Sequence, residues 1–284
     1  MINTICLARS SRAARDVSRA NNFIMKTESV IIQREMAKPA KSKIERYSDL
    51  IIGRRGFWTL LKYELIILFC SRVPGALGLF LRSKLYPQLL GACGSNVVFG
   101  MNVVLRHPHK IKISDNVIID DNCLLDAKGR DNQGIQIGNG VFLGRNSILS
   151  CKNGDIILGE NVNIGFNCEV FSGSRVTLGN DTLVAAYCYF IGGDHDPRDI
   201  ESAVTRQASR SVGIDVGEKC WFGAGVKVLD AVTVGRNSII GAGAVVIKSV
   251  PAYAVAVGIP ARQIRDRRPA GQNEESKPEL SGTS

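Results

Sequence analysis

From Val97 onward the chain repeats a six-residue pattern of hydrophobic and polar positions. Each unit has a small or apolar residue, a variable one, an apolar one, often a glycine, and two more, as in IQIGNG, VNIGFN and VTLGND. Twenty such units start between residues 97 and 244. Their third position is apolar in all twenty and their fourth is glycine in ten, so the pattern is far from chance.

This period predicts a parallel β-helix. Alternate residues of a short strand face the same side, so positions one and three point inward and position two points outward. Glycine then allows a tight corner. Three strand-and-corner units close a triangular coil, and stacked coils pair their strands. We therefore predict an all-β fold of about seven coils, on the order of 34 Å long at one strand spacing per coil.

One segment interrupts the repeat. After Phe190 the next unit starts at Ile214, and residues 192–213 read GGDHDPRDIESAVTRQASRSVG. We predict a loop ejected from the prism at this point. Long loops on a rigid scaffold commonly carry function, so the candidate chemistry is sought here.

His195 in this loop is the candidate general base, with Asp194 and Asp196 beside it. Imidazole titrates near neutral pH, and a neighbouring carboxylate can orient it. A solvated loop histidine is the alternative, but the broken repeat favours a functional role. The chain has no recognisable nucleophile elbow or phosphate-binding loop, so direct transfer is favoured over a covalent intermediate. His107 and His109, in the first coil, are interpreted as structural.

The region before the repeats is apolar and helical in pattern. Residues 57–90 are rich in Leu, Phe and Ile, but charges leave uninterrupted runs of only 65–71 and 73–81, too short to span a bilayer. Apolar residues at helical spacing predict an α-helical extension. It either packs on the β-helix or lies in a membrane surface.

The pattern divides the chain into four parts. Residues 1–46 form a disordered extension, or one that follows from a start codon placed too far upstream. Residues 47–96 are the basic helical leader, residues 97–262 are the β-helix with its ejected loop at 192–213, and residues 263–284 are a disordered tail. Residues 1–40 are polar and lack the apolar segment typical of a secretory signal, so none is expected.

The net charge of +10 lies entirely in the N-terminal third. Residues 1–96 hold 16 Lys and Arg against six Asp and Glu, whereas residues 97–284 hold 20 of each. Anionic lipid and nucleic acid are the usual partners of such a segment. The apolar stretch in the same third favours lipid, and we expect no nucleic-acid partner.

The eight cysteines do not form a disulfide or zinc pattern. Cys123, Cys168, Cys188 and Cys220 occupy the same slot of the repeat, as small wall residues would. No C-x-x-C pair is present, so a structural zinc site is disfavoured and a reducing, cytoplasmic compartment is expected.

Residues 221–262, WFGAGVKVLDAVTVGRNSIIGAGAVVIKSVPAYAVAVGIPAR, resemble the terminal signature of hexapeptide-repeat acyltransferases. That resemblance implies a left-handed β-helix, an acyl donor bound to coenzyme A, and a homotrimer with active sites between adjacent prisms. GGDHDP resembles the catalytic loop of the sugar O-acetyltransferase branch, and residues 47–105 look like acetyltransferases encoded with exopolysaccharide or lipopolysaccharide assembly.

The resemblance also implies site residues. His195 would be the catalytic base. An active-site asparagine of some relatives falls at Gly165 here, leaving Asn167 as a neighbouring candidate, and a supporting glutamate falls near Ser209, leaving Asp194 or Asp196 to orient the histidine. The pantetheine arm would lie on small corners, and cations would hold the nucleotide phosphates. These coenzyme-binding candidates are Gly223, Ala224, Gly225, Gly241, Ala242, Gly243, Lys248 and Arg262.

The resulting expectation is an acetyl-CoA-dependent O-acetyltransferase without a metal. Its acceptor would be a sugar hydroxyl of a cell-surface polysaccharide or of its lipid-linked or nucleotide precursor. The enzyme would be cytoplasmic and peripheral on the inner face of the membrane, through residues 47–96.

Three alternatives are weighed against this expectation. They are an N-acyltransferase acting on an amino sugar or an antibiotic-type acceptor, a non-catalytic β-helix scaffold, and a metalloenzyme resembling γ-class carbonic anhydrases. The last needs three histidine ligands, and His107 and His109 lie about five coils from His195, on the order of 24 Å. That spacing disfavours the metalloenzyme.

Overall fold

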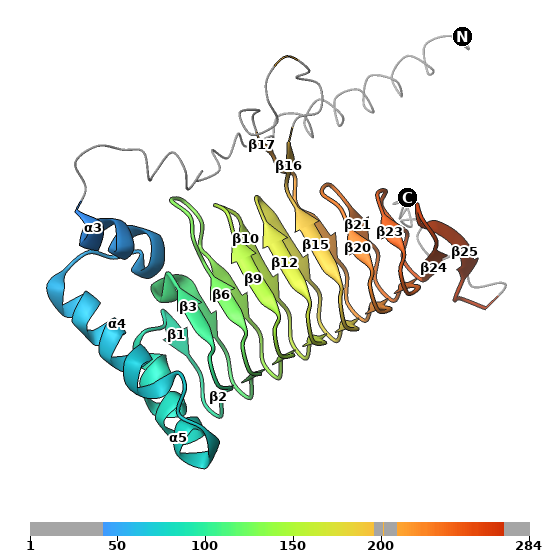
Figure 1. The fold of residues 1–284 in the computed structure, drawn as a ribbon. Coiled ribbons are helices and arrows are strands. Elements are labelled where there is room, and N and C mark those ends of the chain that lie inside the picture. Colours follow the sequence, from blue (N-terminus) through green and yellow to red (C-terminus); the bar gives the residue numbers. More distant parts are fainter. Residues whose placement is uncertain (1–41, 196–200, 202–208, 270–284) are drawn as a thin grey trace, which may run out of the picture.

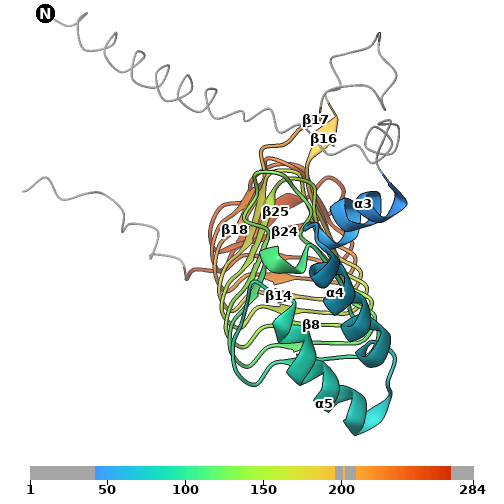
Figure 2. The same ribbon diagram turned by 90° about the vertical axis from the view of Figure 1, so that its left-hand side faces the viewer.

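The computed structural model describes residues 42–195, 201 and 209–269, and these form a left-handed parallel β-helix with helices at its N-terminal end (Figure 1). Viewed from the helical end, the coils enclose one continuous core (Figure 2). The predicted fold class and the prediction of about seven coils are confirmed.

Three sheets form the sides of the prism, and each coil contributes one strand to each of them. Sheet A consists, in spatial order, of β1 (Ala92–Cys93), β4 (Ile111–Ile113), β7 (Ile135–Ile137), β10 (Asp155–Leu158), β13 (Arg175–Leu178), β18 (Ile214–Val216) and β21 (Thr233–Val234). Sheet B consists of β2 (Val98–Phe99), β5 (Ile118–Ile119), β8 (Phe142–Leu143), β11 (Asn163–Ile164), β14 (Leu183–Val184), β19 (Trp221–Phe222), β22 (Ile239–Ile240), β24 (Ala254–Val257) and β25 (Arg262–Asp266). Sheet C consists of β3 (Val104–Arg106), β6 (Leu124–Asp126), β9 (Ile148–Cys151), β12 (Glu169–Ser172), β15 (Tyr189–Gly192), β20 (Lys227–Val228) and β23 (Val245–Val246).

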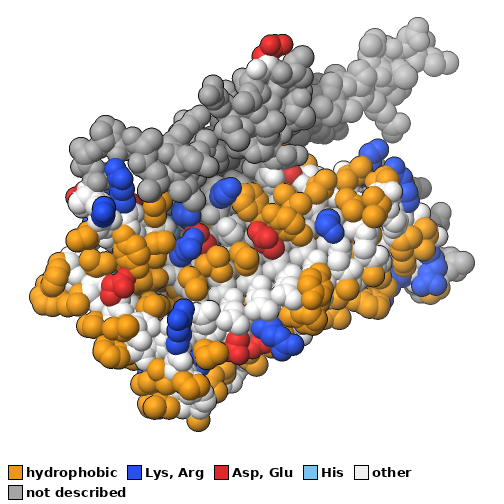
Figure 3. Space-filling view, in the orientation of Figure 1, with side chains coloured by type: hydrophobic (Ala, Val, Ile, Leu, Met, Phe, Trp, Pro, Cys, Tyr) orange, Lys and Arg blue, Asp and Glu red, His pale blue; other side chains and the backbone are white. Residues whose placement is uncertain are grey.

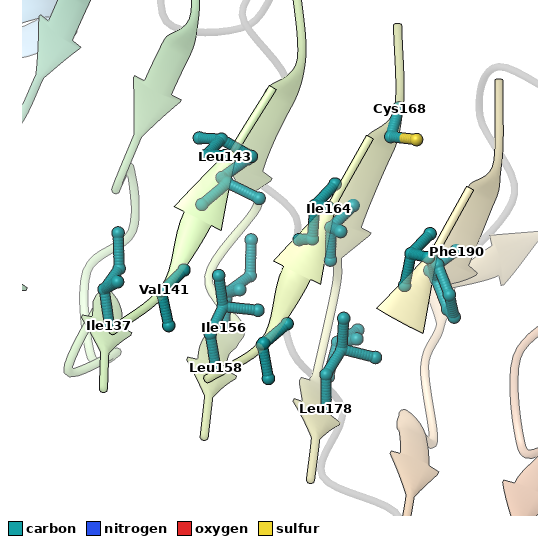
Figure 4. Packing of buried hydrophobic residues seen from close by; sticks show 14 of the residues in the cluster. Ile137, Val141, Leu143, Ile156, Leu158, Ile164, Cys168, Leu178 and Phe190 are labelled. Carbon is teal, nitrogen blue, oxygen red and sulfur yellow. The ribbon is translucent and has the colours of Figure 1, made fainter. Parts of the chain in front are cut away.

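The core is built from the positions that the repeat assigned to the interior. Residues at the third position of all twenty units are buried, and so are those at the first position. Equivalent side chains of successive coils stack in rows, as Ile137, Leu158 and Leu178 do in Figure 4. Cys123, Cys168, Cys188 and Cys220 are buried wall residues, as predicted, and the seven cysteines among the described residues are free thiols.

Helices cover the open end of the first coil. They are α3 (Lys43–Tyr47), η1 (Ser48–Ile52), α4 (Phe57–Cys70), α5 (Gly75–Leu85) and η2 (Tyr86–Gln88), and a further short turn, η3 (Pro108–Lys110), follows β3. Tyr63, Ile66 and Tyr86 pack into the same core cluster or hydrogen-bond to the first coil; the Tyr63 hydroxyl donates to the Leu105 carbonyl. None of the described helices is both long and apolar enough to cross a membrane.

Two predicted boundaries need correction. Helix α3 begins at Lys43, where a Ser42 capping box starts it, so ordered structure precedes the expected residue 47. Residues 263–266, expected in a disordered tail, belong to β25, which pairs antiparallel with β24. This strand was missed because it follows the last repeat and lacks the six-residue pattern. Residues 1–41 of the predicted extension and 270–284 of the predicted tail lie outside the described residues.

Two edges of the prism border sheet C. The BC edge comprises the corners between sheets B and C, residues 100–103, 120–123, 144–147, 165–168, 185–188, 223–226 and 241–244. The CA edge comprises the described connections from sheet C to the next strand of sheet A, residues 107–110, 127–134, 152–154, 173–174, 193–195, 209–213 and 229–232, together with 247–249.

Candidate functional site

His195 lies at the root of the ejected loop, on the CA edge. It belongs to β16 (Asp194–His195), which pairs antiparallel with β17 (Ser209–Arg210) in a hairpin that projects from the prism (Figure 1). Asp194 lies opposite Arg210 and His195 opposite Ser209, the position at which the resemblance placed a supporting glutamate. Asp196 lies outside the described residues.

The loop leaves the stacking of the coils intact. β15 pairs directly with β20, and β13 with β18, so coils before and after the insertion remain neighbours. The hairpin therefore rises from a continuous rigid scaffold, as the interrupted repeat predicted.

Asp230, which the sequence analysis did not single out, holds the returning end of the loop. Its carboxylate accepts hydrogen bonds from the backbone N–H groups of Val212 at 2.8 Å and Gly213 at 2.7 Å. Asp155 does the same for an earlier connection on this edge, accepting from Gln133 and Gly134. The only sequence signal was a carboxylate in the coil that follows the loop.

The small-residue corners that were assigned to coenzyme A lie together on the BC edge. Residues 223–225 and 241–243 stack on one another, with the Gly243 N–H donating to the Ala224 carbonyl at 2.8 Å and the Gly225 N–H donating to the Ala186 carbonyl at 2.9 Å. Arg262 lies opposite Val257 on β25, and Val257 borders Gly241. Ala242, Gly243 and Arg262 are exposed. The structure thus brings this part of the predicted set together.

One position of the BC edge has a left-handed backbone in every coil. The first four coils place asparagine there, at 102, 122, 146 and 167, with φ between 53° and 59°; the fifth places Tyr187, and the last two place Gly225 and Gly243. Asparagine is among the residues that accept this conformation best. Asn167 therefore has a local structural reason for its identity, whatever else it does.

Gly225 and Gly243 are not required by the packing of this chain. A Cβ on Gly243 would meet nothing within 4 Å, and one on Gly225 would meet only Gly243 at 3.9 Å. The left-handed backbone alone does not demand glycine, because four coils satisfy it with asparagine. By contrast, a Cβ on Gly223 would lie 2.5 Å from the Ala242 nitrogen, so that glycine serves coil stacking. The change from asparagine to glycine leaves room outside the prism.

Lys248 is separated from the other coenzyme-binding candidates. It is exposed on the CA edge, in residues 247–249, whereas Arg262 adjoins the BC edge. Within one chain these two cations lie at opposite borders of sheet C. The same separation applies to His195 and the small-residue corners.

Glu169 is a second residue that the sequence reasoning missed. It is half-buried on the outer face of sheet C, in register with Tyr189 of the next coil. Burial raises the pKa of the Glu169 carboxyl, and burial together with Glu169 raises the pKa of Tyr189. Perturbed carboxyls of this kind are enriched at functional sites.

The described residues contain no group of three or more His, Cys, Asp or Glu side chains arranged to hold a metal ion. His107 and His109 are close together, with ring centroids 6.3 Å apart, but lie beneath the helices at the first coil.

Two hexapeptide families match parts of the prism. They are the bacterial transferase hexapeptide (six repeats) over residues 213–248 and the hexapeptide repeat of succinyl-transferase over residues 155–189. The chain is 30% identical over 134 residues to the putative colanic acid biosynthesis acetyltransferase WcaF of Escherichia coli, covering 47% of this chain and 70% of WcaF.

Other relatives share shorter regions. A probable acetyltransferase of Mycobacterium tuberculosis is 29% identical over 134 residues, covering 47% of this chain and 45% of the relative. A putative acetyltransferase of Schizosaccharomyces pombe is 36% identical over 115 residues, covering 38% and 54%. The chain thus spans about half the length of these two relatives.

Among solved structures, an N-acyltransferase of Bacillus cereus, AntD, in complex with dTDP and 3-hydroxybutyryl-CoA has a TM-score of 0.49 at 17% identity, over 70% of this chain and 92% of that one. A galactoside acetyltransferase in complex with coenzyme A has a TM-score of 0.43 at 22% identity, over 74% and 80%. With the fold, the repeats and the match to WcaF together, the chain belongs to the hexapeptide-repeat acyltransferases.

Proposed function

We propose that this protein transfers an acetyl group from acetyl-CoA to a sugar hydroxyl of a cell-surface polysaccharide or its lipid-linked or nucleotide precursor. The observation that carries the donor assignment is the change from asparagine to glycine at the BC edge, which opens space beside residues 223–225 and 241–243. A pantetheine arm must approach a backbone closely, and open glycine corners permit that approach.

The active site would lie between two subunits of a homotrimer. His195 lies on the CA edge and the donor corners lie on the BC edge, so one prism presents the two halves at opposite borders of sheet C. In the closed ring of three copies that we propose, the CA edge of one subunit would face the BC edge of the next. His195 would then face the neighbour's donor corners.

His195 would act as the general base. Its imidazole takes the proton of the acceptor hydroxyl while that oxygen attacks the thioester carbonyl; the tetrahedral intermediate then expels the coenzyme A thiolate, which recovers the proton from the imidazolium. Such a base contributes roughly 10²–10⁴-fold in rate. Asp194 or Asp196 would orient the ring, with Asn167 close to the acceptor. Each backbone N–H donated to the oxyanion typically adds about 3–4 kcal/mol.

The decisive test is calorimetry of acetyl-CoA binding to the wild type and to Gly243→Asn. The substitution installs the residue that four other coils carry in the same conformation, so the fold should survive while the side chain occupies the open space at this corner. We expect at least a tenfold weaker Kd. Gly75→Asn is the matched control, because Gly75 also has positive φ and open space but lies in the helical cap.

A folded wild type that binds no acetyl-CoA would refute the donor assignment and favour the scaffold alternative. His195→Ala separates binding from chemistry: it should keep the wild-type Kd for acetyl-CoA and lose about 10²–10⁴-fold in transfer rate. Product analysis with sugars and amino sugars distinguishes O-acetylation from the N-acylation alternative.

We also propose that the helical end contacts an anionic membrane surface. The outer sides of α4 and α5 expose Trp58, Leu68, Phe69, Leu77 and Phe80, with Trp58 77% exposed. Figure 3 shows hydrophobic side chains gathered over the helical end of the molecule, with basic and acidic side chains scattered among them. α4 buries Tyr63, Ile66 and Cys70 on one side and still exposes large apolar side chains on the other, with Lys62 and Glu64 as its only charged residues, which is unusual for a helix facing water.

Charge favours lipid as the cover for this surface. Arg54, Arg72 and Lys84 are exposed beside it, and each cation near an anionic bilayer adds about 1 kcal/mol. Helix α4, with 14 residues, is about 21 Å long, shorter than the roughly 30 Å hydrocarbon core, so it would lie in the surface.

Sedimentation with phosphatidylglycerol vesicles tests this contact. The double variant Leu68→Glu, Phe80→Glu should lose binding, because it places charge on the surface that enters the lipid. Leu183→Glu, at an exposed apolar residue of sheet B, should bind like the wild type. Equal sedimentation of all three proteins, or none by the wild type, would contradict the proposal.

A further inference from the structure

One residue of the BC edge departs from the pattern of its column. Tyr187 has φ 62° at the position where the four preceding coils carry asparagine and the two following coils carry glycine. A bulky side chain is uncommon in the left-handed region, and residues held in such conformations cluster at ligand sites. The fold accepts smaller residues here, so the tyrosine needs another explanation.

Tyr187 is the last of three exposed side chains on successive coils, Arg145, Phe166 and Tyr187, which we call the ladder. Its ring meets Phe166 of the preceding coil edge to face, with centroids 5.5 Å apart and planes at 79°. The Arg145 guanidinium, one coil earlier, lies 5.5 Å from the centroid of the Phe166 ring. Tyr187 is 60% exposed and Phe166 40%, and Arg145 is exposed as well. Three successive coils thus present Arg145, Phe166 and Tyr187 side by side.

This ladder continues the edge on which the acyl donor would lie. The corners are stacked by backbone hydrogen bonds, from Asn167 N–H to the Arg145 carbonyl, from Tyr187 N–H to the Phe166 carbonyl and from Gly225 N–H to the Ala186 carbonyl. Arg262, the candidate for the nucleotide phosphates, lies at the far end. If the nucleotide is at that end, the thioester points toward coil five and the acceptor approaches from the ladder.

The side chains indicate the chemistry of that acceptor. Exposed aromatic rings stack on the apolar C–H face of a pyranose, and a guanidinium forms paired hydrogen bonds with carboxylate or phosphate oxygens. Among the described residues, no carboxylate forms an ion pair with Arg145. A cation over the Phe166 ring, without a carboxylate partner among the described residues, fits a sugar that carries an anionic group.

We propose that Arg145, Phe166 and Tyr187 form the acceptor subsite and select an anionic saccharide, with the sugar ring on Phe166 and Tyr187 and its acidic group on Arg145. The inference rests on the proposed acetyl transfer for its place in the reaction, whereas saccharide binding itself can be measured without a donor. In this proposal Tyr187 determines acceptor specificity, and its left-handed backbone lowers the stability of the fold.

The test compares saccharide binding by saturation-transfer NMR in the wild type, Tyr187→Asn and Arg145→Gln. The probes are a glucuronate-containing tetrasaccharide, UDP-glucose and neutral maltotetraose, so that carboxylate and phosphate are distinguished. We expect one or both anionic probes to bind the wild type, and both variants to bind them at least tenfold more weakly. Tyr187→Asn should also unfold at a temperature no lower than the wild type, because it relieves a strained backbone.

Tyr253→Asn is the matched control. Tyr253 also has positive φ, at 63°, and lies beneath the arginines 236 and 268, but on the corner between sheets A and B. Its replacement should leave saccharide binding unchanged. The proposal is overturned if no probe binds, if maltotetraose binds as well as the anionic probes, or if Tyr187→Asn binds them like the wild type.

Two further measurements distinguish an acceptor subsite from a subunit contact and from the proposed acetyl transfer. Dissociation of the oligomer by Tyr187→Asn would mean that Tyr187 serves as a subunit contact and not as part of an acceptor subsite, and this also overturns the proposal. Acetyl-CoA binding should be the same in the wild type, Tyr187→Asn and Arg145→Gln. A wild type that binds anionic saccharide but no acetyl-CoA would leave the ladder in place and remove the proposed transfer.

Discussion

The two histidines of the first coil have lowered pKa values because of where they lie in the fold. His107 is 5% exposed, and its Nε2 lies 3.1 Å from the Asp49 carbonyl oxygen, which joins the first coil to the helical cap. Burial lowers the pKa of His107 despite the nearby Asp126 carboxylate. Burial, with the charges of Arg54 and Lys110 and the neighbouring His107, lowers the pKa of His109 to about 4.

These shifts predict a loss of stability in mild acid. Both histidines have a pKa in the folded state below the ordinary value of 6.5, so the unfolded chain binds more protons as the pH falls. Their stabilising contribution is complete above about pH 6.5 and is lost progressively toward pH 4. Chemical denaturation across this range should show a falling free energy of unfolding.

The variant His109→Gln should flatten that decline, because glutamine does not titrate in this range. If its slope of stability against pH equals that of the wild type between pH 6.5 and 4, His109 is not the source of the acid sensitivity.

At the scale of elements, Arg82 ties the helical cap to the prism. Although it is almost fully buried, its guanidinium donates to the carbonyls of Phe99 at 2.9 Å, Cys70 at 3.0 Å and Val73 at 2.8 Å. One side chain thus donates hydrogen bonds to three backbone carbonyls, which belong to segments packed around α5. Hydrogen bonds to a charged group contribute about 1.5–3 kcal/mol each.

Arg82→Met should therefore lower the free energy of unfolding by about 3–5 kcal/mol, because it leaves buried carbonyls without donors. Urea denaturation followed by circular dichroism measures the change. Lys84→Met, at an exposed position of the same helix, should stay within about 0.5 kcal/mol of the wild type. Equal effects of the two variants would show that the buried contacts do not hold the cap.

The loop hairpin depends on an element outside it. Asp230→Asn leaves one acceptor oxygen for the two N–H groups of Val212 and Gly213. We expect the returning strand to loosen and displace His195, so that kcat/KM falls at least tenfold while the Kd for acetyl-CoA is unchanged. Asp155→Asn is the control for the same substitution away from the hairpin: Asp155 Oδ1 alone accepts from both Gln133 and Gly134, so the amide oxygen of asparagine can keep both bonds. Comparable losses of activity in both variants would point to general destabilisation.

At the scale of the whole molecule, the separation of the two edges predicts complementation between subunits. His195→Ala keeps the donor corner and Gly243→Asn keeps the catalytic loop. If the site is shared between neighbouring copies, mixed trimers of the two inactive variants regain activity. After random reassembly, about one quarter of the sites combine both intact halves. Activity assays of the co-refolded mixture measure this.

Separately refolded and then combined variants provide the baseline for that experiment. Activity no higher in the co-refolded mixture would mean that each chain uses its own His195 and its own donor corner.

The repeat alone determined the prism because its signal is local. Whether a residue faces the core depends on its place within a six-residue unit, and twenty units gave twenty buried third positions, from Phe99 to Val246. The ejected loop was predictable for the same reason, as an interruption of that period. The end of the chain was not, since β25 lies beyond the last unit and is held by pairing with β24.

The site was only partly predictable because its members come from different coils. Small residues at 223–225 and 241–243 are visible in the sequence, but their position on a different edge from His195 and Lys248 follows from how sheets A, B and C close. The residues next to Asp230 and Tyr187 in the sequence do not indicate a site, because the groups that these two side chains contact belong to other coils. The sequence by itself determined the fold and the candidate base, through a short-range period. Only the tertiary structure decided which side chains share an edge, because that depends on contacts about twenty residues apart in the chain.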